Sequence, residues 1–321
     1  MEEELWTLSE LTLTKFGLGC MLAMAVGLIC CLIVLVRKRM GYGVWIRLCV
    51  CVIPLSLLVA RLGWVMLDLI MVPLEGMFDL DTGRDLSEAL YFWHGGYSLI
   101  GAVIGAWIGA CLAEKWTRSG KGVLQDSLAL GIPAAIVVER LMERGTSLGL
   151  GRVVTAEWLL NTGIYPEADG DPVHPVYLYE AAVALCLFVI MLVLSLKKDR
   201  SPAGSRLRLF LFLYGLTQVL MESLRADGHM VEHFVHFQQV YALILSCALM
   251  LRWTVMAARK PGRHPALTIG WIITLVCIGA AVLAEFGVDR WGKPMLAYGL
   301  MIVCLAAIGV IGFEFRHMAD R

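Results

Sequence analysis

Nine long apolar runs constrain the fold of this 321-residue chain more than any other feature of its sequence. A helix of about 20 apolar residues crosses the hydrocarbon core of a bilayer, and each run is near that length. The chain is 59% hydrophobic and only 17% charged, which is typical of polytopic membrane proteins. We therefore predict an all-α membrane protein with about nine transmembrane helices, at residues 16–36, 46–72, 97–115, 124–141, 177–196, 207–224, 239–256, 266–286 and 295–315.

The loops between these runs differ in charge, and the difference predicts the orientation of the chain. Lysine and arginine gather after the first, third, fifth, seventh and ninth runs, beginning with Arg37-Lys38-Arg39. Acidic residues dominate the N-terminus and the loops after the second, fourth and sixth runs. Because cytoplasmic loops carry the excess of lysine and arginine, we expect the N-terminus outside and the C-terminus in the cytoplasm.

The composition also excludes some functions. The chain has 27 basic and 27 acidic residues, so its net charge is zero and no nucleic-acid partner is predicted. All ten cysteines lie in or beside apolar runs, and none has zinc-ligand spacing with a histidine. We therefore predict neither a metal site nor a cofactor.

The segment His174-Pro175-Val176-Tyr177-Leu178-Tyr179-Glu180 opens the fifth run with polar side chains. Tyr177 and Glu180 are three residues apart, so they share one face of a helix. A carboxylate that enters hydrocarbon is costly unless it is paired or faces protein. One interpretation is that Glu180 favours the helix start and the tyrosines line the membrane interface. The other is that His174, Tyr177 and Glu180 bind a ligand.

Two segments near the second and third runs are also candidates. Arg61 lies inside the second run, and an intramembrane arginine indicates a functional site unless it forms a structural ion pair, for example with Asp68. Gly95 and Gly96 suit a tight turn that admits a ligand headgroup, and His94 is either a general base or an interfacial polar residue. The third run carries glycines at four-residue spacing, which favours close helix packing: Gly101, Gly105 and Gly109.

Charged residues close the fourth run. Arg140 and Glu143 share a helix face, and three glycines follow before Arg152. The planar fork of arginine suits a phosphate diester, and glycines let the backbone approach it. The alternative is a ladder of interfacial charges that extend to water.

The sixth run carries a polar stripe at helical spacing, formed by Tyr214, Gln218, Glu222 and Arg225. Such a stripe faces protein or a water-filled cavity. Gln239 opens the next run. The predicted topology places all of these candidate groups at the outer ends of their helices. We therefore predict one site at the outer leaflet, which recognises an anionic phospholipid headgroup.

Several of these segments together resemble a known family. They are, in chain order, Ala60 to Val65, Trp93 to Ser98, Ile132-Pro133 with Arg140 to Arg152, His174 to Glu180, Tyr214 to Leu216 with Glu222 and Arg225, and Phe237 to Gln239. Over about residues 10–256 the chain resembles the prolipoprotein diacylglyceryl transferases, bacterial membrane enzymes with seven spans. The resemblance implies a transferase-like core at residues 1–258 and a C-terminal two-helix membrane extension at 259–321.

The resemblance also implies a function. The family moves the diacylglyceryl group of phosphatidylglycerol to the lipobox cysteine of a secreted prolipoprotein, at the outer leaflet of the bacterial inner membrane. The implied partners are phosphatidylglycerol, or another anionic phospholipid, and a prolipoprotein signal peptide. The catalytic candidates are Arg140, His94, Glu222 and Glu143. The substrate-binding candidates are Arg61, Gly95, Gly96, Arg152, His174, Tyr177, Glu180, Gln218, Arg225 and Gln239.

The chain departs from the family pattern at four positions. It has Ile100 in place of a histidine, Glu143 in place of an asparagine, Leu148 in place of a glutamate and Gln218 in place of an arginine. Two alternatives therefore stay open beside the family reaction. One is a transferase with a different acceptor, in which Glu143 acts as acid or base. The other is a non-catalytic homologue that binds phospholipid or acts as a scaffold.

Overall fold

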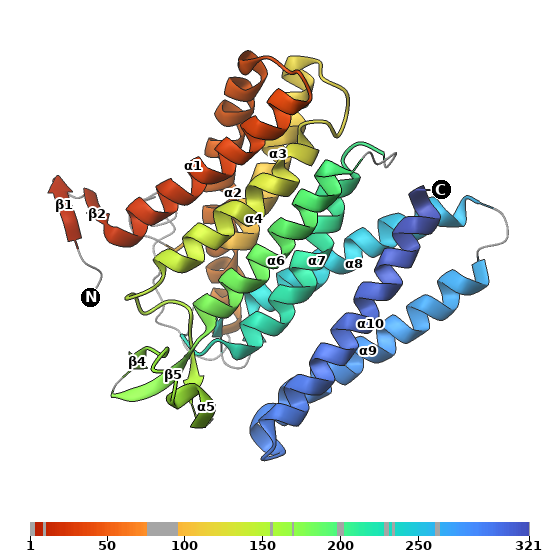
Figure 1. Cartoon of the computed structure of the whole chain (residues 1–321). Coiled ribbons are helices and arrows are strands. Elements are labelled where there is room, and N and C mark those ends of the chain that lie inside the picture. The colour runs from red at the N-terminus through yellow and green to blue at the C-terminus, as the bar shows by residue number, and fades with distance from the viewer. Residues whose placement is uncertain are drawn as a thin grey trace. The chain divides into compact units, whose positions relative to one another are not determined.

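The structure, a computed structural model, describes residues 4–8, 11–75, 96–154, 157–168, 170–197, 202–227, 231–232, 235–260 and 264–320. Nine long helices occupy this described part, one at each predicted run, so the all-α prediction is confirmed (Figure 1). They are α1 (Lys15–Arg37), α2 (Tyr42–Glu75), α3 (Leu99–Thr117), α4 (Gln125–Met142), α6 (Val176–Leu196), α7 (Ser205–Leu224), α8 (Phe237–Ala258), α9 (His264–Arg290) and α10 (Pro294–Asp320).

Eight of these described helices are long and apolar enough to cross a membrane, as expected for a multi-pass membrane protein. The remaining long helix, α4, carries three charged residues, Asp126, Glu139 and Arg140. More than half of its 18 residues are buried. Because α1 and α6 both pack against α4, its charged end is enclosed by protein.

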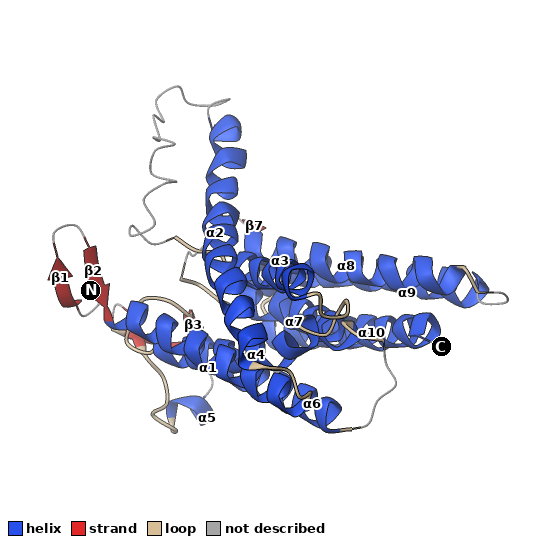
Figure 2. Cartoon of the chain, turned by 90° about the horizontal axis from the view of Figure 1, so that it is seen from above, coloured by secondary structure: helices blue, strands red, loops and turns tan. Residues whose placement is uncertain are grey.

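Short strands connect some of the helices, and the sequence did not predict them (Figure 2). The hairpin β1 (Glu4–Leu8) and β2 (Leu11–Thr14) precedes α1, and a small sheet of order β3-β5-β4 precedes α6. Strands of two to five residues are at or below the shortest length at which alternation identifies a strand. The other short elements are β3 (Leu150–Val153), α5 (Glu157–Leu160), β4 (Glu167–Ala168), β5 (Asp171–Pro175), β6 (Val231–Glu232) and β7 (Val235–His236).

The chain forms two compact units. The first unit comprises residues 1–207 and 225–237, and the second comprises residues 208–224 and 238–321. The second unit therefore contains most of α7 together with α8, α9 and α10.

In the first unit, glycines set the distance between α2 and α3, as their spacing predicted. A Cβ atom on Gly101 would lie 2.7 Å from the carbonyl oxygen of Val59, and one on Gly109 would lie 2.8 Å from that of Cys51. A Cβ atom at Gly105 would overlap the backbone of Leu55. The same device brings α1 and α4 together, where Gly27 faces Gly131. These close contacts hold the helices that support the charged end of α4.

Candidate functional site

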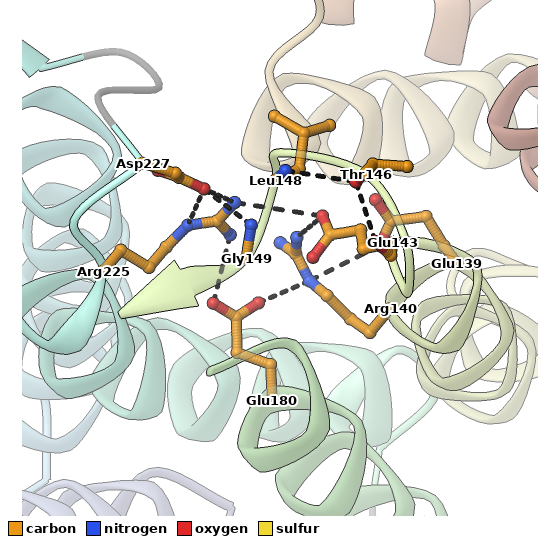
Figure 3. A network of polar contacts seen from close by, with 9 residues as sticks. All are labelled: Glu139, Arg140, Glu143, Thr146, Leu148, Gly149, Glu180, Arg225 and Asp227. Carbon is orange, nitrogen blue, oxygen red and sulfur yellow. Dashed lines mark hydrogen bonds and ion pairs between the residues drawn. The ribbon is translucent and has the colours of Figure 1, made fainter. Parts of the chain in front are cut away.

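Six charged side chains of the first unit form one network, which we call the acid–arginine network (Figure 3). They come from the end of α4, the first turns of α6 and the segment at residues 225–227. Arg140, Glu143, Glu180 and Arg225 are each at most 3% exposed. The six members are Glu139, Arg140, Glu143, Glu180, Arg225 and Asp227.

Glu180 lies between the two arginines of the network. Its Oε2 forms an ion pair with Nε of Arg140, and its Oε1 accepts a hydrogen bond from Nη1 of Arg225 at 3.2 Å. A buried carboxylate is tolerated when it is paired in this way. Glu180 therefore joins the segment around Arg225 to the end of α4.

Glu143 contacts both arginines, but through only one of its two carboxylate oxygens. Its Oε1 forms an ion pair with Nη1 of Arg140 and lies 3.9 Å from Nη2 of Arg225. Its Oε2 is buried and has no hydrogen-bond partner among the described residues. Burial raises the pKa of Glu143 to about 7, against a smaller opposing effect of Arg140. A carboxyl group with this pKa exchanges protons near neutral pH.

The network contains more negative than positive groups. Four carboxylates surround two guanidinium groups, so the fully ionised network has an excess of two negative charges. Buried carboxylates close to one another disfavour full ionisation, so the network favours uptake of a proton. Among the described residues, no group of three or more histidine, cysteine or acidic side chains is arranged to hold a metal ion.

Gly149 links the three segments that carry the network. Its N–H donates to Oδ2 of Asp227 at 2.6 Å, and its carbonyl oxygen accepts from the N–H of Tyr177 at 2.9 Å. Asp227 Oδ2 also accepts from Nη2 of Arg225 at 2.7 Å. Gly149 has a φ of 68°, and a Cβ atom there would lie 2.6 Å from Cβ of Tyr177 and would collide with Oε2 of Glu143. The site therefore requires glycine at this position.

The sequence predicted four members of the network and missed two. The contact between Arg140 and Glu143 follows from their spacing and is confirmed. Glu139 and Asp227 were not among the candidates. Glu139 adjoins Arg140 in the chain, which is a signal for its presence. Asp227 follows the end of α7 in an irregular segment, so no helical spacing identifies it.

Arg61 forms a separate contact at the start of α3. It is 3% exposed, and its Nη1 donates to the carbonyl oxygen of Gly96 at 3.1 Å. Its guanidinium lies 5.0 Å from the ring centre of Trp64 and 6.0 Å from that of Tyr97, which are cation–π contacts. Gly96 has a φ of 73°, and a Cβ atom there would lie 2.7 Å from the ring of Trp64.

Some sequence candidates lie outside the described residues. His94 and Gly95 are among them, as is the side chain of Asp68, the proposed partner of Arg61. Ile100, at the position where the family pattern has a histidine, is 2% exposed in the first turn of α3. The side chain at this position therefore cannot act as a base.

The remaining candidates of the first unit flank the network. Nδ1 of His174 lies 3.1 Å from the hydroxyl oxygen of Tyr179, and burial lowers the pKa of His174. Tyr177 is buried in the first turn of α6, directly after the strand that carries His174. Arg152 lies exposed on β3, unlike the two arginines of the network.

Three candidates belong to the second unit. Gln218 and Glu222 lie on α7 and are 2% and 1% exposed. Gln239, at the start of α8, donates from Nε2 to the carbonyl oxygen of Val219 at 2.9 Å and to Oε2 of Glu285 at 3.3 Å. That these residues share one site with Arg140 stays a prediction.

The fold and the network together define a multi-pass helical membrane protein with a buried cluster of acids and arginines. A family model described as prolipoprotein diacylglyceryl transferase matches residues 3–258 of the chain. The chain belongs to this family, whose members are transferases.

Individual relatives carry the name phosphatidylglycerol–prolipoprotein diacylglyceryl transferase. One from Desulfotalea psychrophila is 30% identical over 173 residues, which cover 51% of this chain and 62% of the relative. One from Aeromonas salmonicida is 30% identical over 175 residues, covering 53% and 62%. One from Clostridioides difficile is 23% identical over 244 residues, covering 74% and 91%. The chain thus spans less than two thirds of the length of the first two relatives.

Proposed function

We propose that this protein transfers the diacylglyceryl group of phosphatidylglycerol to the lipobox cysteine of a secreted prolipoprotein. The match to the family over residues 3–258 carries the proposal. The acid–arginine network supports it, because the network is built from segments that resemble the family and contains groups suited to proton transfer and phosphate binding.

The reaction forms one bond and breaks one. The cysteine sulfur attacks the carbon of the diacylglyceryl group that is bonded to the phosphate oxygen. A carbon–sulfur bond forms as this carbon–oxygen bond breaks. The phosphate oxygen keeps the bonding electrons and leaves as glycerol phosphate. Because the thiolate is the nucleophile, the thiol proton must first pass to a base.

Glu143 is the base that the described residues favour. Its Oε2 is buried without a hydrogen-bond partner among them, and burial raises its pKa to about 7. A base with a pKa near the working pH is the most effective in proton transfer. His94 is the other candidate, and it lies outside the described residues. Glu143 would thus supply the base function in place of the family histidine.

Arg140 and Arg225 are the groups that we assign to the phosphate. Both are buried, and both contact Glu143. When Glu143 takes the thiol proton, it loses its negative charge, so its contacts with the two guanidinium groups weaken while those of Glu180 and Asp227 remain. The guanidinium groups would then turn part of their donor capacity to the developing charge on the leaving phosphate. Preorganised cationic donors of this kind stabilise a transition state strongly in a buried site.

We place the reaction at the outer leaflet of the bacterial plasma membrane, with the N-terminus outside and the C-terminus in the cytoplasm. The bacterial relatives and the apolar helices support the membrane assignment. The alternation of basic and acidic loops supports the orientation. At this leaflet the substrate-binding candidates would contact the lipid headgroup or the signal peptide.

A transfer assay tests the proposal. Purified protein in vesicles that contain phosphatidylglycerol is given a lipobox peptide, and lipidated peptide and glycerol phosphate are measured together. We expect both products in equal amounts, and neither from a peptide with serine in place of the lipobox cysteine. Binding of phosphatidylglycerol without either product would contradict the proposal and favour a non-catalytic homologue. That alternative is also favoured by Ile100 and by the pairing of both arginines with carboxylates.

A further inference from the structure

In the second unit, Glu285 on α9 accepts a hydrogen bond from Gln239 on α8. Nε2 of Gln239 donates to the carbonyl oxygen of Val219 on α7 at 2.9 Å and to Oε2 of Glu285 on α9 at 3.3 Å. Glu285 lies within the apolar stretch Pro265–Val288, where a carboxylate is costly without a partner. The position of Glu285 therefore calls for an explanation beyond helix packing.

These two contacts fix the orientation of the Gln239 amide. The carbonyl oxygen of Val219 and the carboxylate of Glu285 are both acceptors, so the NH₂ group of Gln239 must face them. Both amide hydrogens are then in use. The remaining polar atom, Oε1, accepts no hydrogen bond from the described residues. Gln239 thus presents a fixed hydrogen-bond acceptor.

The two C-terminal helices also contact the adjoining turn of α7. The hydroxyl group of Tyr298 on α10 donates to the carbonyl oxygen of Ser223 at 3.3 Å. Leu220 packs against a buried apolar cluster from both helices, formed by Ala284, Val288, Ala297 and Met301. This turn of α7 carries Gln218 and Glu222 on its polar stripe.

Gln218 provides a second, independent indication of a ligand. It is 2% exposed, and its Oε1 has no hydrogen-bond partner among the described residues. A buried amide oxygen without a partner is unfavourable unless a ligand or water supplies a donor. Gln218 and Gln239 therefore offer two acceptor oxygens, one from α7 and one from α8.

We propose that α9 and α10 determine the choice of lipid headgroup, because Glu285 holds Gln239 so that its Oε1 accepts a hydrogen bond from a headgroup hydroxyl. The proposal rests on the proposed phosphatidylglycerol substrate, whose glycerol headgroup carries hydroxyl donors. An anionic phospholipid without headgroup hydroxyls offers no donor to this oxygen. Glu285 is thus a positioning residue that acts through Gln239.

The test compares two anionic lipids with the full-length protein. Binding and transfer are measured with phosphatidylglycerol and with phosphatidylethanol, which has the same charge but no headgroup hydroxyl. Loss of one well-placed hydrogen bond changes affinity by about tenfold, so wild type should prefer phosphatidylglycerol by about that factor. Glu285→Ala should raise Kd and KM for phosphatidylglycerol by about five- to tenfold and leave kcat within about twofold of wild type. The Kd and KM for phosphatidylethanol should not change.

Matched variants separate positioning from folding. Glu285→Gln keeps an acceptor oxygen and should restore most of the preference. Gln239→Met keeps the side-chain length, removes the amide and should lose the preference as Glu285→Ala does. Glu314→Gln changes an exposed acid on α10 and should behave as wild type.

Two results would overturn the proposal. One is an equal loss for both lipids in Glu285→Ala and Gln239→Met, and the other is an unchanged preference in both variants. If the protein binds lipid but transfers nothing, the proposed transferase function fails while the binding preference still tests Glu285.

Discussion

Glu143 differs from Glu139 and Glu180 because its Oε2 has neither a hydrogen-bond partner nor an ion-pair partner among the described residues. Sequence spacing predicted that Glu143 would contact Arg140, but it did not reveal that Glu180 and Arg225 surround the same group. That arrangement depends on how α4 and α6 pack, which spacing within one helix does not determine. The predicted acid–base role of Glu143 has one consequence that does not require an activity assay.

Glu143→Gln should change how stability depends on pH. The pKa of Glu143 is about 7 in the folded protein and 4.5 ordinarily, so the folded state binds the proton more tightly. The stability from this group is fully present below about pH 4.5 and is lost as pH rises through about 7. The variant should lose this decline when unfolding is measured in detergent from acidic to neutral pH. Glu167→Gln, at an exposed site on β4, is the control, and an unchanged decline in Glu143→Gln would contradict the assignment.

Gly149→Ala should disrupt the network. The added Cβ would collide with Glu143 and Tyr177, and the positive φ is unfavourable for alanine. We expect a loss of more than about 2 kcal/mol in the free energy of unfolding. Gly145→Ala is the matched control, because Gly145 also has a positive φ but no atom within 4 Å of the position that a Cβ would take. Its loss should be about 1 kcal/mol, and equal losses in thermal unfolding would refute the role of Gly149.

At the level of elements, the sequence determined the helices far better than the strands. Each apolar run became a helix because a bilayer-length apolar segment must satisfy its backbone internally. The glycines at four-residue spacing on α3 correctly predicted a close helix contact. The sheet of β3, β5 and β4 was not predicted, although it leads Tyr177 and Glu180 into position. Its strands are short and lie between α4 and α6, so no local pattern in the sequence identifies their pairing.

The contact between α2 and α3 can be tested at its closest point. Gly105→Ala places a Cβ against the backbone of Leu55, so we expect a loss of about 1–3 kcal/mol in stability. Gly279→Ala is the control, since Gly279 lies in the middle of α9 with no atom near a Cβ position. There the better helix propensity of alanine should leave stability unchanged or raise it by up to about 1 kcal/mol. Thermal unfolding of both variants in detergent checks this, and similar effects would argue against the close contact.

At the level of the whole molecule, charge patterning predicts how the chain crosses the membrane. Lys121→Cys should react with a membrane-impermeant maleimide only in inverted vesicles, because the loop after α3 belongs to the basic set. Asn161→Cys should react in intact cells, because the loop after α4 belongs to the acidic set. Both positions are exposed, and wild type supplies the background from its native cysteines. Labelling with the opposite sidedness would reverse the predicted orientation.

The site residues predicted from the sequence are divided between the two compact units. Arg140, Glu143, Glu180 and Arg225 come together in the first unit, as their placement near one membrane face implied. Gln218, Glu222 and Gln239 lie in the second unit. Charge patterning assigns residues to a face of the membrane, but it does not identify their partners. For this reason the sequence missed Asp227 and the contact between Gln239 and Glu285.

The most direct test is the kcat of Glu143→Gln in the transfer assay. If Glu143 is the base, kcat should fall by about 10²- to 10⁴-fold, while binding of phosphatidylglycerol stays near that of wild type. Glu167→Gln should keep the wild-type kcat. A kcat for Glu143→Gln within twofold of wild type, in a protein that transfers the diacylglyceryl group, would show that the acid–arginine network does not supply the base.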